Sequence, residues 1–344
     1  MNGGSLPTPA NQTSLIILGI MSDSNKGGKI IQIVIMILGM VLFGHLIMRI
    51  GWPELVDRFY QIGWWFLPIF FIGLLMFMSI ALAWQQILIS QGHNISYWKL
   101  LRLKIIAEAI NDAAPTANLG GEGARIMLLR KNIPGTDATS SVVLDKTTDN
   151  VAKLLFMFLG VVVSIIFIPL PADWIWGSII FLILICLFNV ILIALQWAGI
   201  VGISSSFVSR ISWLKKLIDR YQHKFDHFDA QLKKAYRDDA EFLAVSTFWH
   251  FVRRLLTVAE VWLILWLLTG NPNLLEPLYI TAMTTVASNA YFIIPGQWGV
   301  AEGTLAILVG VIGQSAGIGI SLGIIRRIRL LFFTAIGLLL FQWR

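Results

Sequence analysis

The chain has 344 residues, yet it has little cysteine and little charge. Cys186 is the single cysteine, which excludes a disulfide within the chain and a metal site built from cysteines. Charged residues make up 13% of the sequence and hydrophobic residues 57%, whereas a soluble domain carries about 25% charged residues. A chain so poor in charge cannot cover its own surface in water. The composition therefore predicts an integral membrane protein.

Motifs for nucleotides and metals are also missing. The sequence has no Gly-x-x-x-x-Gly-Lys-Ser/Thr loop and no His-Glu-x-x-His pair, so we expect neither an ATPase, nor a metal site, nor a cofactor. The net charge of +7 is scattered along the chain, which argues against a nucleic-acid partner. What the chain does have is fourteen tryptophans, a residue enriched at both membrane–water interfaces.

Long apolar segments predict the membrane-spanning helices. A spanning helix needs about 20 mostly apolar residues. Six segments meet this requirement: Ile30–Ile50, Trp64–Ile89, Ala138–Ile168, Trp174–Trp197, Phe242–Leu268 and Gly317–Phe341. Two more, Leu100–Arg130 and Glu276–Gly310, are apolar but interrupted by proline, glycine and charge, which oppose a continuous helix. We predict an all-α polytopic membrane protein with about six spanning helices and two re-entrant or discontinuous segments.

Basic loop residues predict how these segments are oriented, because Lys and Arg concentrate on the cytoplasmic side. The loop at 205–241 is rich in Lys and Arg, whereas Pro169–Asp173 and Gly270–Glu276 have none. On this basis the first broken segment enters from the cytoplasmic side and the second from the outside. We expect a flexible tail at 1–29, one transmembrane domain at 30–344, and both termini in the cytoplasm of a plasma (inner) membrane protein. The loop at 205–241 reads as an amphipathic helix lying on the membrane surface.

The two broken segments share a motif. Pro115 precedes Glu122-Gly by the same interval at which Pro295 precedes Glu302-Gly. The same offset pairs Lys146 with Arg326, and polar Asn111 and Asn289 lie upstream of the two prolines. Similar motifs entering from opposite faces are typical of inverted-repeat transporters, which bind substrate near the midplane between broken helices.

Ionisable residues inside these segments are the candidate site, because each costs roughly 2.5–3.5 kcal/mol to place in hydrocarbon. They could be internal ion pairs that hold helices together, or a cradle for an anionic group. For Glu122 and Glu302 two roles stay open: ion pairs with Arg125 and Arg326 when the site is empty, or binding of a proton or an ion that drives transport. The predicted substrate-binding residues are Asn111, Pro115, Glu122, Arg125, Asp145, Lys146, Asp149, Asn289, Pro295, Glu302 and Arg326.

These residues carry a family resemblance. The chain resembles the lysylphosphatidylglycerol synthase transmembrane family, also called flippase-like membrane proteins, at Asn111, Pro115, Gly121–Arg125, Asp145-Lys146, Asp149, Pro295-Gly296, Gly299, Glu302-Gly303 and Arg326. Asp145-Lys146 departs from the Glu-Arg that is common in the family. The sequence around Pro295 is also similar to that of a hopanoid-associated branch of the family.

The resemblance implies movement of a lipid between leaflets. The best-known members add an aminoacyl-transferase domain, which this sequence, ending at Arg344, does not contain, so lipid aminoacylation is not expected. We predict a transporter or flippase, and not an enzyme, for an anionic or amphipathic lipid such as a phospholipid, hopanoid or polyprenyl lipid. A headgroup enzyme and a scaffold of a lipid-synthesis complex stay open as alternatives. Partners beyond the lipid would be lipid-synthesis enzymes or a second copy of the chain.

Overall fold

The structure, a computed structural model, describes residues 60, 62–113, 120–168, 172–198, 228–270, 273–289, 297 and 299–342. Within them the chain is helical and forms no strand, so the all-α prediction is confirmed. A short 3-10 turn, η1 (Gly63–Trp65), leads into the first described α-helix. The α-helices are α4 (Phe66–Ser90), α5 (Tyr97–Ala113), α6 (Gly120–Leu129), α7 (Gly135–Phe167), α8 (Ala172–Ala198), α11 (Ala240–Thr269), α12 (Leu275–Ser288), α13 (Val300–Val311) and α14 (Ala316–Gln342).

Five of the predicted spans coincide with the long helices α4, α7, α8, α11 and α14, within a few residues at each end. The predicted span Ile30–Ile50 lies outside the described residues. Three described helical segments, Gly63–Ser90, Gly135–Phe167 and Ala172–Ile191, are long and apolar enough to cross a membrane. Helices α11 and α14 have comparable length but carry several charged residues in their middle.

Each predicted broken segment is a pair of short helices. Helix α5 ends at Ala113 and α6 begins at Gly120, while α12 ends at Ser288 and α13 begins at Val300. The second break ends in a tight turn, because Gln297 and Gly299 both have positive φ, 52° and 74°. Glycine accepts this backbone conformation at no steric cost.

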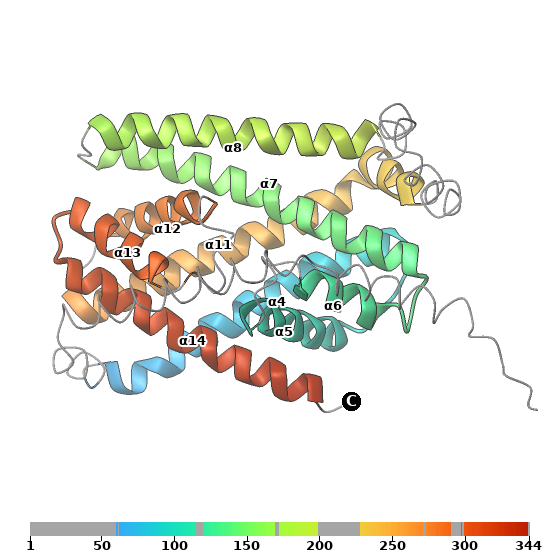
Figure 1. The fold of residues 1–344 in the computed structure, drawn as a ribbon, viewed down its shortest axis with the longest axis horizontal. Coiled ribbons are helices and arrows are strands. Elements are labelled where there is room, and N and C mark those ends of the chain that lie inside the picture. Colours follow the sequence, from blue (N-terminus) through green and yellow to red (C-terminus); the bar gives the residue numbers. More distant parts are fainter. Residues whose placement is uncertain are drawn as a thin grey trace, which may run out of the picture.

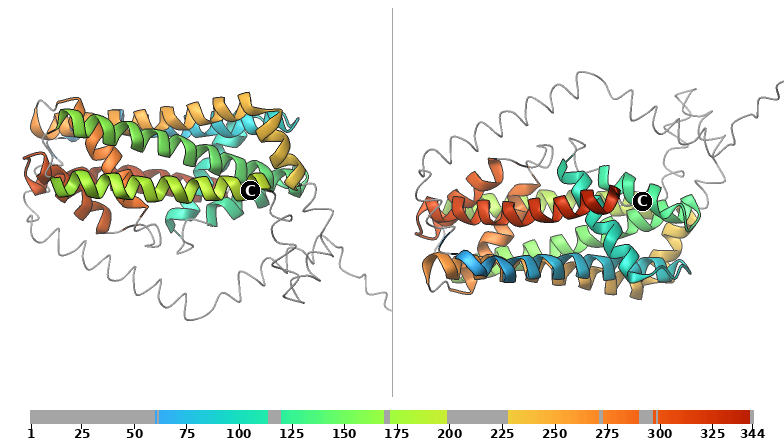
Figure 2. Two further views of the ribbon diagram at one scale, coloured as in Figure 1. Left: turned by 90° about the horizontal axis from the view of Figure 1, so that it is seen from above. Right: turned by 90° about the horizontal axis from the view of Figure 1, so that it is seen from below.

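The two pairs of short helices lie at opposite ends of the bundle (Figure 1). Helices α4 and α14 run in one direction along the long axis, and α7 and α11 run in the other (Figure 1). Figure 2 shows the same separation from two further sides. The units α4–α7 and α11–α14 thus have the same order of elements, a long helix, a helical hairpin and a long helix, in opposite orientation. This is the inverted-repeat arrangement that the sequence predicts.

The repeats interlock through their hairpins. Helix α5 of the first repeat packs against α14 of the second, and α12 of the second packs against α7 of the first. A glycine allows the close approach in both places. A Cβ added to Gly160 of α7 would collide with the Cβ of Ala282 in α12, and one added to Gly337 of α14 would lie 2.5 Å from the Cβ of Ala109 in α5. Each contact therefore joins the last long helix of one repeat to the first hairpin helix of the other.

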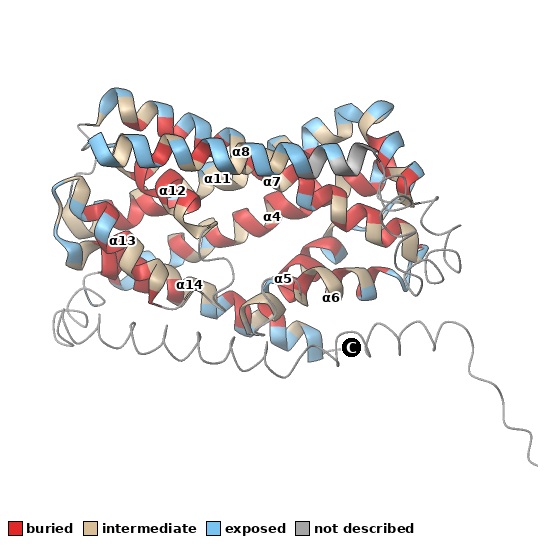
Figure 3. Ribbon diagram, turned by 45° about the horizontal axis from the view of Figure 1, so that its top comes forward, coloured by how far each residue is buried: buried red, intermediate tan, exposed pale blue. Residues whose placement is uncertain are grey.

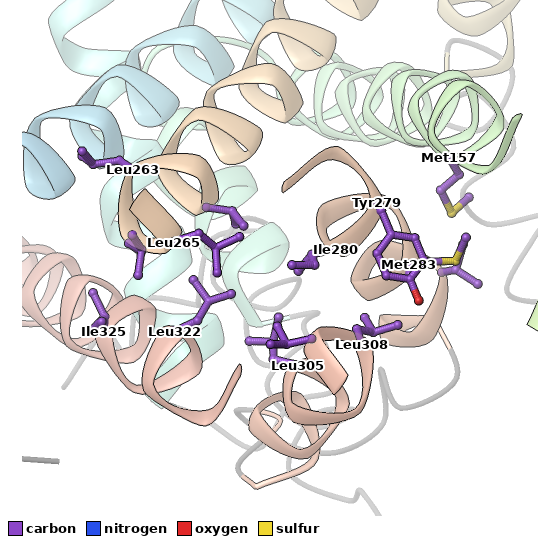
Figure 4. Packing of buried hydrophobic residues seen from close by; sticks show 14 of the residues in the cluster. Met157, Leu263, Leu265, Tyr279, Ile280, Met283, Leu305, Leu308, Leu322 and Ile325 are labelled. Carbon is purple, nitrogen blue, oxygen red and sulfur yellow. The ribbon is translucent and has the colours of Figure 1, made fainter. Parts of the chain in front are cut away.

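Apolar side chains fill the space around the second hairpin. Figure 4 shows Leu305 and Leu308 of α13 facing Ile280 and Met283 of α12, with Leu322 of α14 close by. Helix α8, in contrast, packs on α7 and leaves most of its surface exposed (Figure 3). Its exposed residues include Trp176, Ile180, Leu184 and Phe188. An apolar face of this extent would be unstable in water but suits contact with lipid.

The predicted surface helix in the 205–241 loop falls only partly within the described residues. Residues 228–237 are helical, but their apolar face is buried in the protein. Leu232 and Ala235 are buried and pack with Ile87 of α4 and Leu144 of α7. Leu232 and Ala235 therefore face the bundle, and a position of this helix at the membrane surface stays a prediction. Residues 205–227 of the loop lie outside the described part of the chain.

Candidate functional site

A cavity of about 440 Å³ lies where the two repeats meet, and all four short helices contribute to its wall. The long helices α4, α7, α11 and α14 complete it. Its ionisable lining residues are Glu108, Asp112, Glu122, Lys146, Asp149, Lys153, Arg253, Arg254, Glu302, Arg326, Arg327 and Arg329. Hydroxyl and amide side chains and a few apolar residues line the rest. A polar space of this kind, inside a bundle with apolar outer faces, marks a functional site in a membrane protein.

At the first hairpin, Glu122 of α6 accepts a hydrogen bond from Lys146 Nζ at 2.8 Å. Asn111 of α5 ties the two short helices together, because its Oδ1 accepts from the Gly121 amide at 2.7 Å. Its Nδ2 also approaches Glu122 at 3.5 Å. A Cβ on Gly121 would collide with the Ala107 carbonyl, so glycine is needed for this approach.

The second hairpin repeats this pairing with stronger burial. Glu302 of α13 is 1% exposed, and its Oε1 accepts from Arg327 Nη2 at 2.7 Å and Nε at 3.0 Å. Its Oε2 accepts from the amide of Gly299 at 2.8 Å, which closes the first turn of α13. In both repeats the hairpin glutamate is therefore held by a base on the following long helix.

Both predicted ion pairs are wrong. Glu122 pairs with Lys146 instead of Arg125, and Glu302 pairs with Arg327 instead of Arg326. Successive residues on an α-helix point about 100° apart, so a one-residue difference in alignment changes which base faces the hairpin. Arg326 instead forms an ion pair with Glu260 of α11, with Nε 3.4 Å from Oε2. Arg327 is the structural counterpart of Lys146.

Asp145 of α7 is the centre of a buried network behind the cavity. Its Oδ2 accepts from Lys104 Nζ and from Arg125 Nη2, each at 2.6 Å. Nε2 of His250 lies 3.1 Å from its Oδ1. The Arg125 guanidinium also lies 4.0 Å from the ring centre of Trp84, a cation–π contact. One carboxylate thus joins both short helices of the first hairpin to α7 and α11.

Two further acids anchor the bases of α11 and α14. Asp149 of α7 accepts from Arg254 at 2.8 Å and lies 3.7 Å from Arg253. Glu260 of α11 is fully buried and pairs with both Arg326 and Arg329 of α14. The pairs of Asp149 join the two repeats, because α7 belongs to the first and α11 to the second, whereas the pairs of Glu260 join two helices of the second repeat.

The structure brings most predicted site residues to the cavity. Asn111, Glu122, Lys146, Asp149, Glu302 and Arg326 line it. Arg125, Asp145 and Asn289 do not: the first two form the buried network, and Asn289 donates to the Thr285 carbonyl at 2.7 Å. Substrate contact at these three stays a prediction. Pro115 and Pro295 lie outside the described residues.

Several lining residues are not among the predicted site residues, although the charged ones lie inside the predicted membrane segments. Glu108 and Asp112, four residues apart on α5, line the cavity, as does Lys153 of α7. A row of hydroxyls on α12 does the same: Thr281, Thr284, Thr285 and Ser288. The three- and four-residue spacing of this row was a readable signal, since it places all four side chains on one helix face.

Among the described residues, the ionisable lining has seven bases and five acids, a difference of +2. A group with a negative charge can therefore enter without leaving the cavity negatively charged. Arg and Lys offer it charge-assisted hydrogen bonds, and the carboxylates and hydroxyls offer acceptors to any donor that it carries. The arrangement can shelter a polar, anionic group inside the membrane.

Comparison with known proteins agrees with this architecture. No curated protein and no solved structure matches the chain significantly. The family model for the lysylphosphatidylglycerol synthase TM region matches residues 29–337. This match covers most of the sequence, including both hairpins and the cavity, and it confirms the resemblance seen in the motifs. The chain therefore belongs to the lysylphosphatidylglycerol synthase TM region family of integral membrane proteins.

Proposed function

We propose that this protein is a lipid transporter that moves an anionic or amphipathic lipid between leaflets without changing it chemically. Family membership relates the chain to lipid handling in membranes. The observation that carries the finer proposal is the charged cavity of about 440 Å³, which both inverted hairpins line. The lipid tail would stay in hydrocarbon, so the protein needs to shelter only the headgroup.

Charged groups are costly to place in hydrocarbon. A headgroup that crosses the bilayer alone loses its hydration, which for a charged group costs many kcal/mol. The lining bases and hydroxyls replace part of that hydration. Internal ion pairs hold Lys146, Arg254 and Arg327 in place when no lipid is bound, because each of these three bases has an acid within reach.

The inverted repeats support a mechanism of alternating access. In such transporters one repeat moves against the other around a central site. Here the interlocking contacts Gly160–Ala282 and Gly337–Ala109 lie between the repeats, and the ion pair of Asp149 with Arg254 lines the cavity wall. Small side chains at both contacts allow helices to slide, which favours motion between repeats over motion within them.

A headgroup enzyme is less well supported. Acid–base chemistry by Glu122 and Glu302 would need a carboxyl group that can exchange protons, yet each is held by a base. The sequence Gly319-Ile-Ser321-Leu-Gly323 matches the Gly-x-Ser-x-Gly motif of hydrolases, which requires a strained turn between a strand and a helix. Ser321 instead lies within α14, is 2% exposed, and donates to the Gly317 carbonyl.

The location and partners follow from the same proposal. We place the protein in the plasma (inner) membrane with both termini in the cytoplasm, on the basis of the Lys- and Arg-rich loop at 205–241. A role as scaffold for lipid-synthesis enzymes is the remaining alternative. Copurification of a stable synthase, together with absence of transport by the purified protein, would favour it.

Reconstitution tests the proposal. The purified protein is placed in vesicles that contain an acyl-NBD phospholipid, and dithionite is added outside to bleach the outer leaflet. We expect the inner-leaflet fluorescence to be lost faster than in protein-free vesicles. Fluorescence loss equal to that of empty vesicles for anionic and zwitterionic phospholipids, a hopanoid and a polyprenyl lipid would refute transport.

A matched pair of variants links transport to the cavity. Lys146→Gln removes a cavity base whose side chain is 48% exposed, so the fold should survive. Lys234→Gln makes the same change in the helix at 228–237, where the side chain is 53% exposed and pairs with Asp239 at 3.6 Å. We expect slower transport for Lys146→Gln and an unchanged rate for Lys234→Gln.

A further inference from the structure

Most charges of the cavity are neutralised within the protein. Among the lining bases, Lys146 pairs with Glu122, Arg253 and Arg254 with Asp149, and Arg327 with Glu302. Arg326 and Arg329 pair with Glu260 behind the wall. These groups already have partners, so a ligand would have to compete for them. The lining groups that have no ion-pair partner among the described residues indicate which ligand the cavity can bind.

Lys153 of α7 is the base that remains. Within the described part of the chain, no acid lies within ion-pair distance of its ammonium group and no side chain or carbonyl accepts from it. It lies one helical turn beyond Asp149, beside the guanidinium groups that Asp149 holds. A lone ammonium in this position can accept a phosphate without breaking an internal pair.

Two carboxyl groups also remain, and both are on α5. Glu108 and Asp112 are four residues apart, so they lie on the same face of the helix and both line the cavity. Asp112 accepts a hydrogen bond from Thr334 at 2.8 Å. Neither carboxyl group forms an ion pair with a described base. Arg327 and Arg329 lie within electrostatic range of Asp112, but no described base touches either carboxyl group, so both can still contact a cationic ligand directly.

The hydroxyl row on α12 contains a buried hydroxyl group that lacks a described hydrogen-bond partner, which is an independent indication of a ligand. Thr281 is 3% exposed and lines the cavity, and its Oγ1 has no hydrogen-bond partner among the described residues. Thr284 and Thr285 donate to the backbone of their own helix, at 2.6 and 2.7 Å, which leaves their oxygen lone pairs free to accept. Buried polar groups are normally satisfied, so Thr281 is expected to find its partner in a bound molecule.

We propose that the cavity binds a zwitterionic headgroup that carries both a phosphate and a primary ammonium, as phosphatidylethanolamine does. Lys153 holds the phosphate, Glu108 and Asp112 hold the ammonium, and the hydroxyls of α12 satisfy the remaining polar atoms. The volume of about 440 Å³ falls within the range of small-molecule sites, ~300–1,000 Å³. This inference rests on the proposed transport function and names the substrate class of the same site.

The test compares two lipids that differ in the headgroup alone. Acyl-NBD phosphatidylethanolamine and acyl-NBD phosphatidylglycerol with identical chains are measured in the same proteoliposomes by dithionite bleaching. The wild type should transport the ethanolamine lipid at least about tenfold faster, which corresponds to one charge-assisted hydrogen bond to the ammonium. The double variant Glu108→Gln/Asp112→Asn should bring the two rates close together, and Lys153→Gln should slow both.

The outcomes separate this inference from the function on which it rests. Transport of phosphatidylglycerol at the same rate as phosphatidylethanolamine, or faster, by the wild type would overturn the inference and leave lipid transport standing. A rate ratio unchanged in a double variant that elutes as a monodisperse peak in detergent would also overturn it. Absence of transport for every lipid would refute the proposed function, and the inference with it. The wild-type ratio needs no variant, so the test does not depend on the mutants folding.

Discussion

Removing the charge of Asp145 tests the buried network most severely. Asp145→Asn keeps the shape of the side chain but leaves Lys104 and Arg125, each 6% exposed at the side chain, without a counter-charge. Both bases lie 2.6 Å from the same carboxylate oxygen, so they would also repel each other. Among the described residues, Asp149 also attracts Lys104, but it forms no ion pair with either base.

The expected loss of stability is large. Removing one partner of a buried ion pair costs about 3–5 kcal/mol, because an uncompensated charge stays buried. Two bases are left here, so we expect a loss near the upper end, about 5 kcal/mol. Total stabilities of proteins are roughly 5–15 kcal/mol. The free energy of unfolding, measured by SDS titration in mixed micelles, should therefore fall by a substantial part of its total.

Two comparisons control this prediction. Asp239→Asn makes the same substitution in an ion pair with the half-exposed Lys234, where at most about 1 kcal/mol is expected. Adding Lys104→Met to Asp145→Asn removes one of the two stranded bases and should recover part of the loss. If Asp145→Asn and Asp239→Asn lower stability equally, the network does not hold the first hairpin and our reasoning is wrong.

Other buried contacts should respond to substitution in a similar way. Arg327→Met should cost about 3–5 kcal/mol, since it strands the buried carboxylate of Glu302, and adding Glu302→Gln should restore part of it, as measured by SDS titration. Gly160→Ala should cost about 1–3 kcal/mol by overpacking against Ala282, and Gly160→Ala/Ala282→Gly should recover it; equal midpoints for single and double variants would contradict the contact. Gly121→Ala should destabilise the first hairpin, and faster proteolysis near 114–119 is the readout, with unchanged cleavage counting against it.

Much of the fold could be predicted because apolar length and interruption are local signals. The positions of α4, α7, α8, α11 and α14 follow from runs of apolar residues. The breaks after α5 and α12 follow from proline and glycine, which oppose a continuous helix. The inverted relation of the hairpins follows from loop charges combined with one shared motif. These signals do not depend on which side chains meet in the folded chain.

Contacts between distant helices were not predictable in the same way. The offset that aligns Glu122 with Glu302 also aligns Lys146 with Arg326, yet Arg327 is the residue that faces Glu302. That choice depends on the rotation of α14, which packing against α5 and α13 sets. Tertiary packing likewise decides that the 228–237 helix is buried against the bundle, although its amphipathic pattern alone would also suit a membrane surface.

The proposed transport requires that the lipid headgroup pass through the cavity between the two hairpins. A phospholipid with a photoreactive diazirine in its headgroup, irradiated in proteoliposomes and followed by peptide mass spectrometry, tests it directly. We expect crosslinks on the cavity faces of α7 and α12, at 146–153 and 281–288. Crosslinks confined to the exposed face of α8, around Trp176–Phe188, would contradict it.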